Sequence, residues 1–173
     1  MEGLGPEDFA EDIKDTIEQA DGRYYLEQSK KLGATHSILY CRLPGWASDE
    51  TRRVKVDILV PPSLNLPMIS AYETFLINNI PVMPIFDLLV MKTQGWRDHR
   101  NSHREDFRAK ERADVSDIFA LLESAKQQKV SYVDEVNEDR HSLEFMIHAC
   151  NLVNKFVHVY GRARQWRALG FPV

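Results

Sequence analysis

The chain has 173 residues, of which 43% are hydrophobic, and its 22 Lys and Arg against 26 Asp and Glu give a net charge of −4. These values predict one compact domain over 1–173, and they argue against a disordered, collagen-like or multidomain protein. The negative charge disfavours nonspecific nucleic-acid binding, and the longest apolar stretch is too broken by Pro81, Pro84 and Asp87 to predict a membrane span.

The first half of the chain predicts one helix followed by short strands. Apolar residues recur at helical spacing from Pro6 to Ala20, and Asp21-Gly22 ends that helix. Aromatic or alternating residues then predict strands over 23–28, 36–43 and 53–60, followed by one or two edge strands over 75–83. Two cysteines in ordinary contexts and an acidic N-terminus predict a reducing, cytoplasmic setting.

The strand predicted over 53–60 carries the first candidate functional residue. Its alternation places Val54 and Val56 on a core face and Asp57 on the opposite face together with Lys55. Because a strand fixes a carboxylate rigidly and Mg²⁺ prefers carboxylate oxygens, Asp57 is a candidate catalytic residue and metal ligand, with Lys55 as a candidate nucleotide contact. The competing interpretation is a solvent-exposed Asp57 that pairs with Lys55.

The second half of the chain predicts helices. Helical spacing is found over 85–96, 114–126 and 143–160, and residues 162–167 predict one further turn. The charge-dense segment 97–112 is expected to be a surface loop or a solvated helical turn. Strands in the first half and helices in the second predict an α+β protein, with a small mixed or antiparallel sheet packed by helices and a helical C-terminal part.

A cluster of cations lies at the end of the helix predicted over 85–96. Lys92, Arg97 and Arg100 are candidate nucleotide-binding residues, because Lys offers a point charge and Arg a fork to a triphosphate. The alternative is a solvated face whose cations pair with neighbouring acids. His99 and His103 have the i, i+4 spacing of a metal pair, which is common by chance without a third ligand.

The helix predicted over 114–126 has acids in its first turn. Asp114 or Ser116 is expected to cap this helix, while Asp117 complements its positive end. The chain contains no glycine-rich phosphate loop, no G-x-S-x-G turn and no C-x-x-C pair. These absences argue against the commonest phosphate-loop, dinucleotide and zinc modules.

Three segments follow one another in a characteristic order: R-R-V-K-V-D-I-L-V over 52–60, P-V-M-P-I-F-D-L-L-V-M-K over 81–92 and R-A-K-E-R-A-D-V-S-D-I-F-A-L-L over 108–122. The run R-Y-Y-L-E-Q-S-K-K-L-G-A-T-H over 23–36 precedes them. Together they resemble the nucleotidyltransferase superfamily, in particular its minimal and antitoxin-associated branches and fungal proteins of that kind. The resemblance covers residues 7–125 and leaves 140–168 as a helical C-terminal extension.

The resemblance implies a metal-dependent fold that transfers a nucleotide from a nucleoside triphosphate to a hydroxyl or phosphate. It implies that Asp57 is the third carboxylate of the family's triad, that Lys92 lies near the triphosphate, and that Asp114 and Asp117 are structural acids. The family's Gly-[Gly/Ser] turn and Asp-x-Asp strand are expected before the helix over 6–20, where five residues stand. Because two metal ions need two or three carboxylates, we expect a catalytically incomplete protein that retains binding of a nucleotide and Mg²⁺.

Two alternatives stay open. The first is an active magnesium-dependent nucleotidyltransferase that is completed by sequence absent here or by another chain. The second is a protein- or RNA-interaction module that uses the basic segment 155–167. A sheet that lacks its first strand would also expose an edge, which predicts a homodimer paired through that edge.

Overall fold

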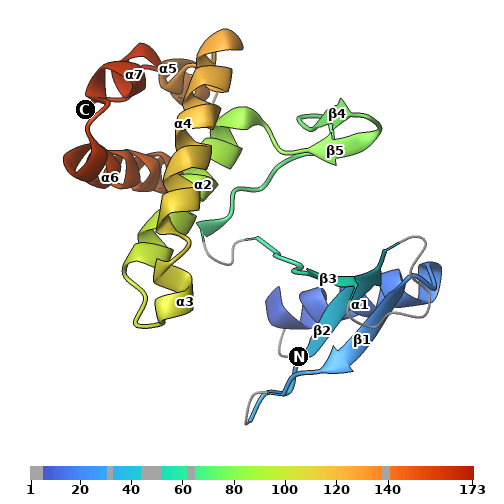
Figure 1. Ribbon diagram of the computed structural model, residues 1–173. Coiled ribbons are helices and arrows are strands. Elements are labelled where there is room, and N and C mark those ends of the chain that lie inside the picture. The colour runs from blue at the N-terminus through green and yellow to red at the C-terminus, as the bar shows by residue number, and fades with distance from the viewer. Residues whose placement is uncertain (1–5, 31–32, 44–51, 62–64, 138–140) are drawn as a thin grey trace. The chain divides into compact units, whose positions relative to one another are not determined.

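The computed structural model describes residues 6–30, 33–43, 52–61, 65–137 and 141–173 (Figure 1). The chain divides into two compact units, Met1–Leu66 and Pro67–Val173. The first unit combines one helix, and the second unit several, with a small antiparallel sheet, so the predicted α+β class is confirmed. Within the described part of the chain, none of the helices is both long and apolar enough to cross a membrane.

The first unit is a three-stranded antiparallel sheet with one helix. Its elements are α1 (Pro6–Ala20), β1 (Tyr24–Gln28), β2 (Ser37–Arg42) and β3 (Arg53–Val56), and the strand order is β1-β2-β3. Two carboxylates of α1 accept hydrogen bonds from strand amides, Glu18 from Leu26 at 2.7 Å and Glu11 from Ser37 at 3.0 Å. These bonds attach α1 to β1 and to the first residue of β2.

β3 is shorter than the strand predicted over 53–60, because its pairing with β2 ends at Val56. Asp57 therefore lies just after the strand rather than inside it. The prediction that Val54 faces the core is wrong, since this side chain is 48% exposed. The physical reason is that α1 packs mainly against β1, at the other edge of the sheet.

The second unit opens with a short hairpin, β4 (Phe75–Ile77) and β5 (Ile80–Val82), which confirms the edge strands predicted there. Asn78 and Asn79 form its two-residue turn with φ angles of 52° and 63°. Asparagine tolerates this left-handed region better than most residues, and two such residues in succession suit the tight turn of a hairpin.

Helices make up the rest of the second unit. They are α2 (Ile85–Arg100), α3 (Glu105–Arg108), α4 (Glu111–Gln127), α5 (Tyr132–Asn137), α6 (Leu143–Tyr160) and α7 (Ala163–Ala168). The predicted helix over 143–160 is confirmed at both ends, where the Ser142 hydroxyl accepts a hydrogen bond from the Phe145 amide at 3.2 Å and Gly161 stops the helix with a φ of 73°. The segment 97–112 contains the last turn of α2, the short α3 and the first two residues of α4, and α5 was not predicted.

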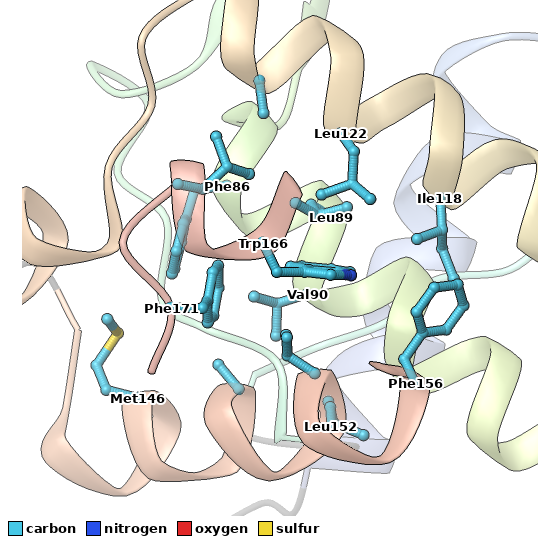
Figure 2. Packing of buried hydrophobic residues seen from close by; sticks show 14 of the residues in the cluster. Phe86, Leu89, Val90, Ile118, Leu122, Met146, Leu152, Phe156, Trp166 and Phe171 are labelled. Atoms are coloured by element: carbon cyan, nitrogen blue, oxygen red, sulfur yellow. The ribbon is translucent and has the colours of Figure 1, made fainter. Parts of the chain in front are cut away.

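The core of the second unit is aromatic and lies among α2, α4, α6 and α7. Figure 2 shows its side chains pointing into one shared interior. Phe156 is fully buried at its centre, with ring centroids 5.0 Å from Trp96 and 5.9 Å from Trp166. This core holds the C-terminal ends of α2 and α6 in place, and those ends carry the candidate site.

Candidate functional site

The candidate residues of the first unit, Lys55 and Asp57, contact each other. Lys55 Nζ lies 2.5 Å from Asp57 Oδ1, and the two side chains are 53% and 65% exposed. This is the geometry of the competing interpretation, a solvent-exposed acid beside a lysine. The Asp57 carboxylate is nevertheless open to solvent, so a ligand can reach it. A single carboxylate suits one Mg²⁺ that also carries phosphate oxygens, and it does not suit a pair of metal ions.

Lys92 of the second unit connects α2 to two acids of α4. Its Nζ lies 2.6 Å from Asp117 Oδ2 and 3.7 Å from Asp114 Oδ1, and the hydrogen bond to Asp117 raises the pKa of Lys92. The Asp114 side chain is 8% exposed and also lies 2.6 Å from His99 Nδ1. The ammonium group of Lys92 is thus paired with acids of α4. Its contact with phosphate stays a prediction.

The expected cap of α4 is wrong. This helix begins at Glu111, three residues before the predicted start, and the residue at its N-cap is Lys110. Asp114 therefore stands inside the helix and faces α2 through His99 and Lys92. Asp114 is buried because it pairs with His99 and Lys92 of the neighbouring helix α2. The sequence pattern alone does not distinguish such an acid from a helix cap.

Arg97 and Arg100 line a pocket of about 360 Å³ at the C-terminal ends of α2 and α6. We call it the cationic pocket, and its lining residues are Trp96, Arg97, Arg100, Asn101, Asn154, Lys155, His158 and Val159. The structure thus joins two of the predicted nucleotide-binding residues to a lysine and a histidine from the other end of the sequence. Its volume lies within the range of small-molecule sites, about 300–1,000 Å³.

Helical periodicity explains how α6 contributes to the cationic pocket. Val153 and Phe156 are fully buried on the inner side of α6, whereas Asn154, Lys155 and His158 are exposed. Residues three or four positions apart are neighbours on a helix surface, so Asn154 and Lys155 each lie beside His158 on the outer side. The negative end of α2 also favours the cations of Arg97 and Arg100, which lie in the last turn of that helix.

Arg100 is positioned by a carboxylate that it shares with another helix. Glu111 Oε1 accepts a hydrogen bond from the Arg100 guanidinium and one from the Tyr160 hydroxyl, the latter at 2.5 Å. Burial alone would raise the pKa of Glu111, but these two hydrogen bonds outweigh it and the pKa is lowered. The Glu111 carboxylate therefore stays ionised and holds Arg100 at the rim of the cationic pocket.

The positive charge of the cationic pocket reaches a neighbouring histidine. Burial is the first cause that lowers the pKa of His148, and the charges of Arg97 and Lys155 lower it further, against the charge of Asp98. His148 Nε2 lies 2.8 Å from the Gln94 side-chain oxygen. Burial first, and the nearby positive charges second, therefore favour the neutral form of His148.

Sequence reasoning found Arg97 and Arg100 but did not connect them with Lys155 and His158. It assigned Lys155 to a separate basic segment, because the two parts of the pocket are far apart along the chain. The available signal was the outer face of the helix over 143–160, where the polar residues recur at helical spacing opposite the apolar ones.

No group of three or more His, Cys, Asp or Glu among the described residues is arranged to hold a metal ion. Comparison of the chain with protein-family models, with curated proteins and with solved structures finds no match. The functional argument therefore depends on the residues of this chain and on their geometry.

Proposed function

We propose that this chain is a nucleotidyltransferase-like protein that binds a nucleoside triphosphate without transferring a nucleotide. The observation that carries the proposal is the cationic pocket, in which Arg97 and Arg100 lie with Lys155 and His158. The nucleotide is suggested by the sequence resemblance over 7–125, which draws on both units.

The chemistry of the lining residues favours a polyphosphate. The Arg97 guanidinium donates two hydrogen bonds to Asp98, and that of Arg100 donates one to Glu111. Each guanidinium keeps its remaining N–H donors for phosphate oxygens, and Lys155 adds a compact positive charge. The side-chain amides of Asn101 and Asn154 can donate to further oxygens. Trp96 is 2% exposed, so its ring belongs to the core rather than to a stacking surface for a base.

The absence of transfer follows from the number of carboxylates. The resemblance assigns a single carboxylate to Mg²⁺, that of Asp57 in the first unit. In the two-metal scheme one ion activates the attacking oxygen and the other stabilises the leaving oxygen. One carboxylate cannot hold both ions, so we expect binding without turnover from this chain alone.

The test is titration calorimetry of the whole chain with ATP, CTP, GTP, UTP and inorganic triphosphate, each with and without Mg²⁺. Lys155→Gln should weaken binding of all five compounds by about tenfold, which corresponds to the loss of one charged hydrogen bond. Lys126→Gln is the matched control, because Lys126 is an exposed lysine of α4 outside the pocket. Equal affinity of the two variants, or no binding at millimolar nucleotide, would overturn the proposal.

Asp57→Asn separates the metal contribution from the phosphate contribution. We expect it to weaken binding of Mg²⁺ itself, titrated as MgCl₂ without nucleotide, and to leave metal-free nucleotide binding unchanged. Asp15→Asn serves as its control, since Asp15 is an exposed acid of α1. Formation of a labelled product from a nucleoside triphosphate would replace this proposal by the first alternative, an active transferase.

The RNA-interaction alternative receives less support from the structure. The Arg162 guanidinium lies 4.7 Å from the centre of the Phe119 ring, and Arg167 donates a hydrogen bond to the Val173 carbonyl. These two cations of the basic segment are engaged in contacts within the fold. Arg164 is exposed, so Arg164→Gln is the variant that tests this alternative in a salt-dependent RNA-binding assay.

A further inference from the structure

A second pocket of the same unit has the opposite charge. It has a volume of about 300 Å³ and lies among the segment 69–75, the beginning of α2, α5 and residue 141. We call it the acidic pocket, and the residues of its lining that matter here are Tyr72, Glu73, Phe75, Asp87, Glu135 and His141. None of these residues lines the cationic pocket, so a ligand of the acidic pocket lies outside the proposed function.

Two of the acids and the histidine of this pocket are buried. The side chains of Asp87, Glu135 and His141 are 4%, 12% and 6% exposed. His141 Nε2 lies 3.3 Å from Asp87 Oδ1 and 3.3 Å from Glu135 Oε2. The imidazole ring is held in place by stacking on Phe86, with ring centroids 5.7 Å apart.

Asp87 does not have the hydrogen bond that a buried carboxylate oxygen normally has. Asp87 lines the pocket, and its buried Oδ1 accepts no hydrogen bond from the residues that the structure describes; His141 Nε2 likewise makes none with them. A charged hydrogen bond between nitrogen and carboxylate is normally about 2.7–2.9 Å long, so 3.3 Å is an ion pair without that bond. A buried polar atom in this state costs free energy that a donor entering the pocket would recover.

The described lining of the pocket also has more acidic than basic side chains. Three carboxylates, those of Glu73, Asp87 and Glu135, line it with a single imidazole. The raised pKa of Asp87, about 6, has burial as its first cause, and the charges of Glu135 and Glu73 add to it against that of His141. A cation is therefore the ligand that this charge distribution favours.

The outer wall of the pocket is aromatic. Tyr72 is 99% exposed and Phe75 is 59% exposed, although both line the pocket. Aromatic faces attract ammonium and guanidinium groups, and the interaction adds to that of the carboxylates. The small volume excludes a large ligand but accommodates one cationic group on a short alkyl chain.

We propose that the acidic pocket binds a guanidinium or primary ammonium group on a short alkyl chain. Asp87 and Glu73 accept its hydrogen bonds, while Tyr72 and Phe75 flank the alkyl chain and the cation. The group belongs either to a free small molecule or to an arginine or lysine side chain of a partner peptide. Both sources share this chemistry, and titrations with a small cation and with a peptide distinguish them.

The test is a titration of the ¹⁵N-labelled whole chain with n-butylguanidinium, followed by amide chemical shifts. The matched control ligand is n-butylurea, which has a similar shape without the charge. We expect shifts at Glu73, Asp87 and Glu135 with butylguanidinium and none with butylurea. Equal shifts with both compounds would overturn the proposal.

Variants assign the binding to the carboxylates. Asp87→Asn keeps the shape of the side chain and removes its charge, and we expect it to weaken butylguanidinium binding at least about tenfold. Glu73→Gln, at a half-buried position, is a second test of the carboxylates if Asp87→Asn disturbs the fold. Asp134→Asn is the control, because Asp134 is an exposed acid of α5 outside the pocket. Unchanged affinity in both pocket variants contradicts the proposal.

Two further titrations settle the source and the class of the cation. Binding of the peptide acetyl-Gly-Arg-Gly-amide, compared with its citrulline counterpart, supports a partner side chain if it exceeds that of butylguanidinium. The reverse order supports a free small molecule. If CaCl₂ or MgCl₂ shifts the same amides and the organic cations do not, the pocket is a metal site and the proposal is wrong.

Discussion

The hydroxyl of Tyr160 lies 2.5 Å from Oε1 of Glu111, and this bond connects the last residue of α6 to the first residue of α4. The same oxygen accepts a hydrogen bond from Arg100 at the end of α2. One carboxylate thus fixes three helix ends and one wall of the cationic pocket.

Replacing Glu111 should therefore affect both stability and binding. We expect Glu111→Gln to lower the free energy of unfolding near neutral pH by about 1 kcal/mol, because the charged acceptor is lost. The folded pKa of Glu111 is lowered, so its contribution is present above the ordinary value of 4.5 and disappears as the pH falls through the folded pKa. Urea unfolding at neutral and acidic pH measures this. Glu105→Gln, at an exposed position of α3, should show no such difference.

Asp114 and Asp117 offer a matched pair of acids on one helix. Asp114 is 8% exposed and bonded to His99, whereas Asp117 is 51% exposed and bonded to Lys92. We expect Asp114→Ala to cost about 2 kcal/mol, since it removes a buried carboxylate and its hydrogen bond to the 21% exposed His99 side chain. We expect Asp117→Ala to cost about 0.5 kcal/mol, because solvent screens the exposed pair. Equal losses of unfolding free energy in chemical denaturation would show that burial of the carboxylate does not determine its contribution to stability.

The sequence predicted most helices of the second unit because their apolar residues have a regular period. It predicted the strand over 53–60 too long, since alternation continues past Val56 although pairing with β2 stops there. It missed α5, a six-residue helix that is too short for its period to be visible. The acidic pocket could not be predicted, because Asp87 and His141 come together only through packing of distant segments.

The charged groups of the acidic pocket predict how stability depends on pH. The folded pKa of Asp87 is about 6 against an ordinary 3.8, so the folded state binds this proton more tightly and stability falls as the pH rises through that window. Burial lowers the pKa of His141, but the carboxylates of Glu135 and Asp87 outweigh burial and raise it, so its contribution is lost as the pH rises above 6.5. Asp87→Asn should match the wild type in acid and exceed it in stability above pH 6.

This pH dependence is measured by urea unfolding of both proteins across the window. Asp134→Asn is again the control, and its difference from the wild type should not change with pH. A constant difference between Asp87→Asn and the wild type would show that the carboxyl of Asp87 titrates normally in the folded state.

Phe156 should be among the most sensitive core positions. It is fully buried and contacts four aromatic side chains, those of Trp96, Phe119, Tyr160 and Trp166. We expect Phe156→Ala to cost about 3–5 kcal/mol, because the cavity cannot close around rigid rings. Val159→Ala, at a 41% exposed position of the same helix, should cost less than about 1 kcal/mol. Thermal or urea unfolding of both variants gives the comparison.

The hairpin of β4 and β5 has a consequence for the behaviour of the chain in concentrated solution. Leu76, Ile77 and Ile80 are 70%, 58% and 64% exposed, and short apolar strands of this kind tend to join strands of other molecules. Pro81, which stands opposite Leu76, has no amide hydrogen with which to extend a ladder. It thereby acts as a gatekeeper, and its replacement by Val would be expected to turn the hairpin into a nucleus for aggregation.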